Sequence, residues 1–240
     1  MNLVVIEETV RRSVTSIAYV SYVALVGIIS LGVSRFDKPG AAWPSLVALL
    51  AYIVGCAPIG PEFSSGTLQL ILTKPVNRSV YLLSRVAGAV CAVWIATFAC
   101  FGCELIGRTL WSDASRIDIM GTALIHSLAD TILICALLVF FGSFTRAYFN
   151  IAIYFVLMIG LSVSQGILAM TRAMQGALGA WLRAHNIVDR AIAAVERNLF
   201  TDAPPRLDWH WLLMVLTNAA LALVAACFIF RNREVPYGAD

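Results

Sequence analysis

Six long apolar segments constrain this chain more than any other feature of its sequence. About 18 to 20 apolar residues are needed to cross the hydrocarbon core of a lipid bilayer. The segments that reach or approach this length are residues 16–34, 43–60, 84–107, 119–145, 147–170 and 209–230. Hydrophobic residues make up 60% of the chain and charged residues only 13%, whereas about a quarter of a soluble domain is charged. We therefore predict an all-α, polytopic membrane protein with six transmembrane helices, which form a single domain over residues 1–240.

Amphipathic segments lie next to these spans. Near the N-terminus, Leu3, Ile6, Val10 and Val14 recur at helical spacing, and charged residues occupy the opposite face. This pattern predicts an interfacial helix that leads into the first span. Apolar residues within 172–208 also recur at helical spacing, which predicts external amphipathic helices between spans five and six.

Lys and Arg residues in the short connections predict the orientation. One side of the membrane would carry eight of them, namely Arg11, Arg12, Lys74, Arg78, Arg85, Arg146, Arg231 and Arg233. The opposite side would carry four, namely Arg35, Lys38, Arg108 and Arg116. Because the more basic side faces the cytoplasm, we predict a multi-pass protein of the plasma (inner) membrane with both termini in the cytoplasm.

A polar stretch from Pro61 to Arg78 interrupts the apolar sequence on the predicted cytoplasmic side. Ser64 or Ser65 is a suitable cap for a new helix, and Pro75 would end it. The apolar residues between them form a short stripe of Leu68, Ile71 and Leu72. We predict a short amphipathic helix outside the hydrocarbon. Its stripe would fill a groove on a partner protein or, alternatively, rest on the membrane surface.

The same stretch resembles the signature of a known family. Between the second and third spans of ABC type-2 permeases, the membrane subunits of ATP-binding-cassette exporters, the pattern reads roughly E-x-x-x-GTL-x-x-LL-[ST]-x-P-V-[ST]-R. This chain is similar over residues 62–78, although Asn77 replaces the usual small hydroxyl residue. The resemblance extends to the amphipathic start, the number of spans and the sequence from Phe141 to Arg146.

In that family this segment is the coupling helix, which docks into a groove on a separate ATPase subunit. The resemblance implies that the contacts to the ATPase are made by Glu62, Gly66, Thr67, Leu68, Ile71, Leu72, Lys74, Pro75 and Arg78. It also implies a complex of two ATPase subunits with this chain and a second permease copy, identical or closely related. ATP and Mg would bind to the ATPase partner, because this chain contains neither G-x-x-x-x-G-K-[ST] nor G-x-G-x-x-G.

Ionisable residues inside the third and fourth predicted spans form a second candidate site. Placing an ionisable group in the hydrocarbon of a membrane costs free energy, so such groups usually face a cavity, a partner or a pathway. Glu104 and Arg108 are four residues apart, which predicts an ion pair on one helix. His126 and Asp130 have the same spacing, and two hypotheses compete for them: a hydrogen-bonded packing contact, or a polar lining of a translocation path. The candidate path residues are Glu104, His126 and Asp130.

No catalytic or metal site is expected. The sequence contains no H-E-x-x-H, and the Ser next to His126 lies on another helix face. Cys100 and Cys103 have C-x-x-C spacing within a span, and we interpret them as packing residues. We expect a transport subunit rather than an enzyme, surrounded by the lipid bilayer, with no cofactor of its own and no nucleic-acid partner. The alternatives are a proton-coupled secondary transporter that uses Asp130, and a permease-like subunit that transmits force without transporting.

Overall fold

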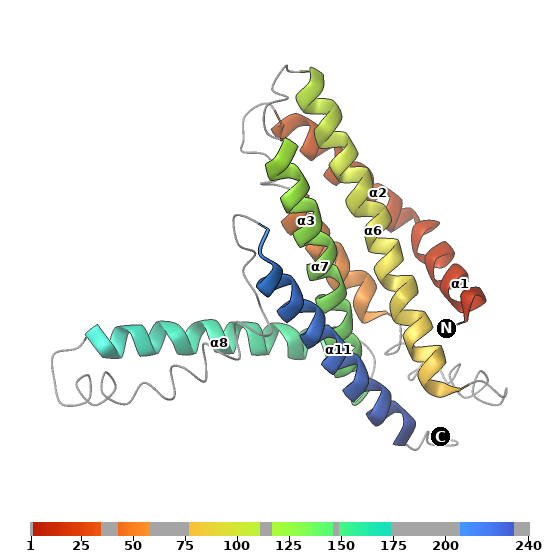
Figure 1. Ribbon diagram of the computed structural model, residues 1–240, viewed down its shortest axis with the longest axis vertical. Coiled ribbons are helices and arrows are strands. Elements are labelled where there is room, and N and C mark those ends of the chain that lie inside the picture. Colours follow the sequence, from red (N-terminus) through yellow and green to blue (C-terminus); the bar gives the residue numbers. More distant parts are fainter. Residues whose placement is uncertain are drawn as a thin grey trace. The chain divides into compact units, whose positions relative to one another are not determined.

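The computed structural model describes residues 2–34, 43–57, 77–110, 117–145, 149–173 and 207–232. All regular structure in these ranges is α-helical (Figure 1), so the predicted all-α class is confirmed. The helices are α1 (Leu3–Val14), α2 (Ile17–Val33), α3 (Trp43–Cys56), α6 (Arg78–Leu110), α7 (Ile117–Gly142), α8 (Phe149–Ala173) and α11 (Trp209–Asn232). A helix therefore lies at each of the six predicted spans, and α1 coincides with the helix predicted at the N-terminus.

Fewer helices than six meet the length and composition expected of a full span. Within the described residues, α6, the Ile119–Gly142 part of α7 and α11 are long and apolar enough to cross a membrane. Helices α1 and α2, bent by 66° where they meet, add a fourth candidate if they are counted as one broken span. Helix α3 and the Phe149–Leu161 part of α8 are apolar but shorter. The structure thus supports three to four spans, and the six-span topology stays a prediction.

The chain divides into two compact units. One consists of Met1–Ile151 together with Pro204–Asp240, and the other of Ala152–Ala203. The first unit holds α1, α2, α3, α6, α7, α11 and the first residues of α8. The described part of the second unit is the remainder of α8. All the sites considered below lie in the first unit.

Helix α7 is the centre of the first unit. It packs against α3, α6 and α11, and it runs between them in Figure 1. Every residue from Leu133 to Val139 is buried, so this part of the helix is covered around its whole circumference. A helix that is apolar on all sides is expected in such a position. Cys135 and Val139 of α7 join one core cluster with residues of α6 and α11, among them Leu82 and Phe230.

Small residues allow α2 and α3 to approach their neighbours closely. A Cβ atom built on Gly27 of α2 would lie 3.1 Å from Sγ of Cys103 in α6. One built on Gly55 of α3 would lie 3.0 Å from Cδ1 of Leu138 in α7. Close backbone approach at small residues is the usual way in which membrane helices associate. Cys103 of the C-x-x-C pair therefore contributes to helix packing.

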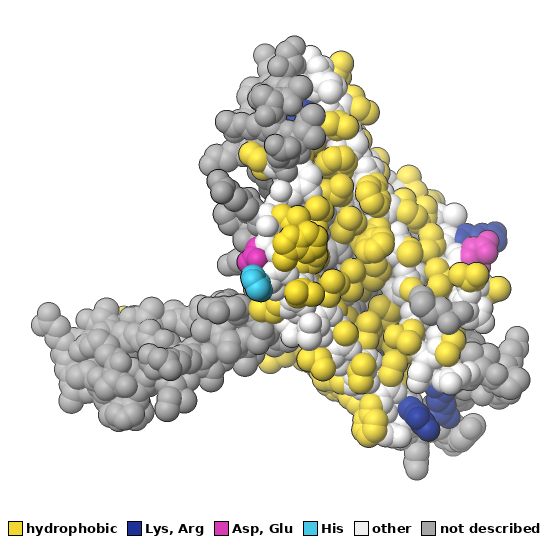
Figure 2. All heavy atoms as spheres, viewed as in Figure 1, with side chains coloured by type: hydrophobic (Ala, Val, Ile, Leu, Met, Phe, Trp, Pro, Cys, Tyr) yellow, Lys and Arg dark blue, Asp and Glu magenta, His cyan; other side chains and the backbone are white. Residues whose placement is uncertain are grey.

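Apolar side chains also cover much of the outside of the first unit. On the face shown in Figure 2, hydrophobic side chains dominate the described surface and charged ones are sparse. On α11 alone, Leu213, Leu221, Val224 and Phe228 are between 62% and 68% exposed. Apolar surface of this extent is unusual on a soluble monomer, and it is expected where the surrounding medium is lipid.

Some predicted elements lie outside the described residues. They include the coupling segment up to residue 76 and most of the external amphipathic region at residues 172–208. The third span, predicted at 84–107, is longer than expected, since α6 begins at Arg78 and ends at Leu110. The second, predicted at 43–60, is described as a helix only over Trp43–Cys56.

Candidate functional site

The start of α6 joins the predicted coupling segment to the helical body. The side chain of Asn77 accepts a hydrogen bond from the backbone nitrogen of Ser79 at 3.1 Å. The carbonyl of Asn77 accepts from the backbone nitrogen of Tyr81 at 3.0 Å. These are the two bonds of a helix N-cap, a role that Asn, Ser and Thr all perform well. The departure of Asn77 from the family signature therefore preserves the capping chemistry.

Helix α6 continues without a break for 33 residues. At a rise of 1.5 Å per residue its length is roughly 50 Å, which exceeds the roughly 30 Å of a bilayer core. Arg78, one of the predicted ATPase-contact residues, is the first residue of this helix. A displacement of the segment that ends at Arg78 would therefore act directly on one continuous helix.

Helix α1 packs against the first turns of α6. The backbone nitrogen of Asn2 donates to Oγ of Ser84 at 2.8 Å, and Nη1 of Arg85 donates to Oγ1 of Thr9 at 3.0 Å. A Cβ atom on Gly88 would lie only 2.6 Å from Cβ of Thr9. The N-terminal helix is thus held against α6 by two polar contacts and by one position that tolerates only glycine.

The predicted Glu104–Arg108 ion pair is present. Nε of Arg108 lies 2.9 Å from Oε1 of Glu104, and both residues are only 3% exposed. The other carboxylate oxygen accepts a hydrogen bond from Nε1 of Trp43 in α3. Trp43 is in turn in edge contact with Phe101. Glu104 is therefore saturated by protein groups and links α6 to α3.

His126 lies at the contact of α7 with α11. Its ring meets the indole of Trp211 edge-on, with the ring centroids 4.5 Å apart. His126 is 6% exposed, and neither its Nε2 atom nor Nε1 of Trp211 has a hydrogen-bond partner. The described structure contains no hydrogen bond between His126 and Asp130, so the spacing of four residues does not join them here.

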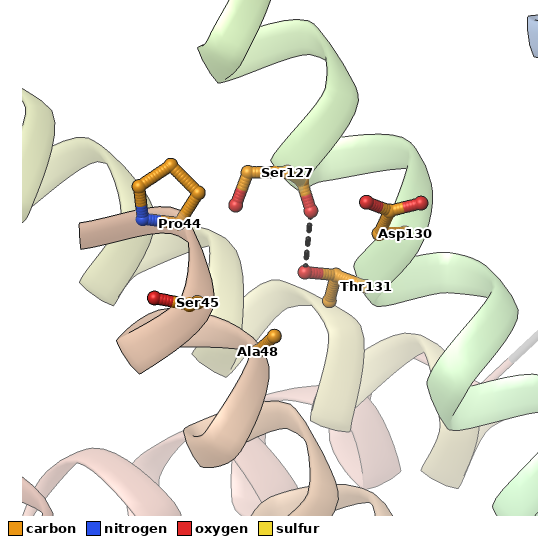
Figure 3. A pocket seen from close by; sticks show the side chains of 6 residues that line it. All are labelled: Pro44, Ser45, Ala48, Ser127, Asp130 and Thr131. Carbon is orange, nitrogen blue, oxygen red and sulfur yellow. Dashed lines mark hydrogen bonds between the residues drawn. The ribbon is translucent and has the colours of Figure 1, made fainter. Parts of the chain in front are cut away.

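Asp130 lines a cavity of about 150 Å³ between α3 and α7 (Figure 3). The other residues that line it are Pro44, Ser45 and Ala48 of α3, with Ser127 and Thr131 of α7. The hydroxyl of Thr131 donates to the backbone carbonyl of Ser127 at 2.8 Å, which is the dashed contact in Figure 3. Within the described part of the chain, Asp130 has no ion pair. The cavity thus combines one carboxylate with three hydroxyl groups.

The three candidate path residues therefore have separate surroundings. Glu104 is paired, His126 is packed against an aromatic ring, and Asp130 faces a cavity. Sequence reasoning did not identify the α3 half of this cavity, including Ser45. The spacing of Ser127 and Thr131, four residues apart and on either side of Asp130, was a local signal of a polar strip on α7.

The comparison with known families agrees with these observations. The profile described as "ABC-2 family transporter protein" matches residues 7–235, which is nearly the whole chain. No curated protein matches the chain. The apolar helices and the apolar outer surface are those of a multi-pass membrane protein. The chain belongs to the ABC-2 transporter family and is a membrane permease component of an ABC transporter.

Proposed function

We propose that this chain is the permease subunit of an exporter in the plasma (inner) membrane, with both termini in the cytoplasm. In this proposal a separate ATPase subunit, present in two copies, hydrolyses ATP with bound Mg. A second permease copy, identical or closely related, completes the translocation unit. Membership of the ABC-2 family supports the pairing with an ATP-binding subunit.

The coupling segment would receive the work of ATP hydrolysis. Closure of the ATPase pair would push on residues 61–78, with Leu68, Ile71 and Leu72 in a groove of the ATPase. The observation that carries this proposal is the unbroken helix from Arg78 to Leu110, capped by Asn77 directly after the segment. Because α6 is a continuous helix attached directly to residues 61–78, a displacement of those residues would tilt the whole helix as a rigid body.

Asp130 is the best candidate for a residue on the translocation path. Glu104 has both carboxylate oxygens occupied, and His126 is held against Trp211. Asp130 lines a cavity formed by described residues of α3 and α7. Alternating access would expose this cavity first to one side and then to the other, as ATP binding favours one of two conformations.

The coupling role is tested by charge placed on the apolar stripe. Leu68→Asp with Ile71→Asp puts two carboxylates where the ATPase groove is expected. Gln69→Asp with Thr73→Asp adds the same charge on the other side of a helix and is the matched control. In the intact complex, the first pair should abolish transport driven by ATP and release the ATPase during purification, while the control pair retains both.

Three outcomes would contradict the proposal. If the stripe variant keeps the ATPase and transports normally, the segment does not couple. If the purified chain alone moves solute in response to a proton gradient and loses that activity in Asp130→Asn, it is a secondary transporter. ATPase activity that responds to the chain without any transported solute would instead assign a force-transmitting subunit.

A further inference from the structure

We propose that the cavity between α3 and α7 binds the ammonium group of an organic cation, with Asp130 as its counter-ion. This inference rests on the proposed transport function, because it names the substrate class of that same path. It begins from an asymmetry in the charges of the first unit. The buried carboxylate of Glu104 is matched by Arg108 at 2.9 Å, whereas the half-buried Asp130 has no basic partner among the described residues.

Among the described residues of the helices packed against α7, none forms an ion pair with Asp130. Helix α3, which forms the opposite wall, contains no charged residue. On α7 the nearest titratable group is His126, which faces Trp211 of α11. On α6 the charged pair Glu104 and Arg108 satisfies itself. A carboxylate in a low-dielectric setting gains more from a cation than the same group in water, so this cavity selects for positive charge.

The depth of Asp130 fits a transport site. It lies at the midpoint of the Ile119–Gly142 span, and membrane transporters commonly bind their substrates near the bilayer midplane. An ionisable residue at this depth usually marks a pathway or a partner. The cavity therefore lies at a depth where a transported group would bind during translocation.

The size and chemistry of the cavity favour an organic ammonium group over a bare metal ion. A volume of about 150 Å³ is several times the roughly 30 Å³ that one water occupies in the liquid. An ammonium group carries several N–H donors and needs an acceptor for each of them. Asp130 supplies carboxylate oxygens, and Thr131, whose proton is donated to Ser127, presents lone pairs. Pro44 and Ala48 give apolar walls for the adjoining carbon atoms.

The experiment measures protection of Asp130 from a membrane-permeant carbodiimide, which reacts with carboxyl groups in apolar surroundings. The full-length chain in lipid nanodiscs is treated at constant pH, and peptide mass spectrometry measures the rate at which unmodified Asp130 disappears. This readout counts the N-acylurea and also the N-butylamide that free butylamine can form with the activated carboxyl group. The probes are butylammonium, sodium ion and the uncharged 1-butanol. We expect saturating butylammonium to slow labelling of Asp130 at least threefold, and sodium ion and 1-butanol to leave the rate unchanged.

A matched pair of variants tests whether the cavity itself is responsible. Thr131→Val removes an acceptor from the cavity, while Thr97→Val makes the same change on α6, where the hydroxyl donates to the carbonyl of Val93 at 2.9 Å. Both threonines are buried. Protection by butylammonium should weaken several-fold in Thr131→Val and persist in Thr97→Val. Ala48→Leu, which fills the cavity, should abolish protection while Asp130 remains present.

Five outcomes would overturn the inference. Three concern the probes: no protection by butylammonium, equal protection by sodium ion, or equal protection by 1-butanol. Two concern the variants: equal protection in the two threonine variants, or full protection in Ala48→Leu. Because the assay uses the chain without its ATPase, its result is separate from the coupling experiment. If butylammonium protects Asp130 but the coupling experiment fails, the cation site is supported and the proposed function is rejected. If the coupling experiment succeeds but butylammonium gives no protection, the proposed function is supported and the cation site is rejected.

Discussion

Trp43 and Glu104 connect two helices that are far apart in the sequence. The indole nitrogen of Trp43, the first residue of α3, donates to one carboxylate oxygen of Glu104 in α6. The other carboxylate oxygen accepts from Nε of Arg108 at 2.9 Å. A buried carboxylate is tolerated only when hydrogen bonds and a counter-charge replace its water. Glu104 therefore holds α3 against α6, which is a structural role.

The first prediction concerns this buried ion pair. Glu104→Ala takes the carboxylate away from Arg108 and should lower the free energy of unfolding by about 3–5 kcal/mol. Replacing both partners by apolar residues, Glu104→Leu with Arg108→Met, should cost far less, because no buried charge is left to be compensated. Unfolding in mixed detergent micelles, followed by tryptophan fluorescence, measures both changes. Equal losses in the single and double variants would refute the assignment.

The second prediction concerns the contact of α1 with α6. Gly88→Ala places a methyl group 2.6 Å from Cβ of Thr9 and 3.1 Å from the backbone oxygen of Ile6, so we expect a loss of about 1–3 kcal/mol. Gly102→Ala is the control on the same helix, since nothing lies within 4 Å of its added Cβ. It should be neutral or stabilise by up to about 1 kcal/mol. Thermal unfolding in detergent compares the two variants. An equal change of the unfolding temperature in both would contradict close packing at Gly88.

The third prediction separates packing from transport at His126. His126→Phe keeps an aromatic edge against Trp211 and removes the unpartnered Nε2 atom. It should leave the unfolding temperature unchanged or slightly higher, because a buried polar group without a partner is costly. His126→Ala should lose about 2–4 kcal/mol, in the range for truncation of large buried side chains. A stable His126→Phe protein that no longer transports would show that the imidazole acts on the path.

The fourth prediction concerns the start of α6. Asn77→Ala removes the acceptor of the Ser79 amide and should cost about 1 kcal/mol. Hydrogen–deuterium exchange of the first turn should then be about fivefold faster. Asn77→Ser retains an acceptor and should exchange at the wild-type rate. If Ser and Ala behaved alike, the cap would not hold the start of this helix.

The differences between the predicted and observed helices have physical causes. The third span was predicted over residues 84–107, a range that contains Arg85. The helix begins earlier, at Arg78. Thr9 and Tyr81 accept hydrogen bonds from the Arg85 side chain, so the charge is accommodated within the fold. The Thr9 contact comes from α1, another helix, and leaves no local signal in the sequence around Arg85.

The candidate sites also differ in whether their contacts are local in sequence or come from another helix. The Glu104–Arg108 pair follows from a spacing of four residues on one helix, and the structure contains it. The same spacing left two hypotheses for His126 and Asp130, a hydrogen-bonded packing contact or a lining of the path. In the described part of the chain, His126 packs against the indole of Trp211 in α11, and Asp130 lines a cavity with residues of α3. The predicted contacts of residues 62–76 with an ATPase remain predictions, since they lie outside the described residues.

Sequence alone determined the class of this protein, the places of the helices in its described part, and its family. These depend on the length of each apolar segment and on a short motif, and both are properties of consecutive residues. Only the tertiary structure decided which polar groups are satisfied and which face open space. That outcome depends on how closely the helices approach, and small residues such as Gly27, Gly55 and Gly88 set the distance. Asp130 and Ser45 line one cavity because α3 and α7, which are distant in sequence, pack side by side.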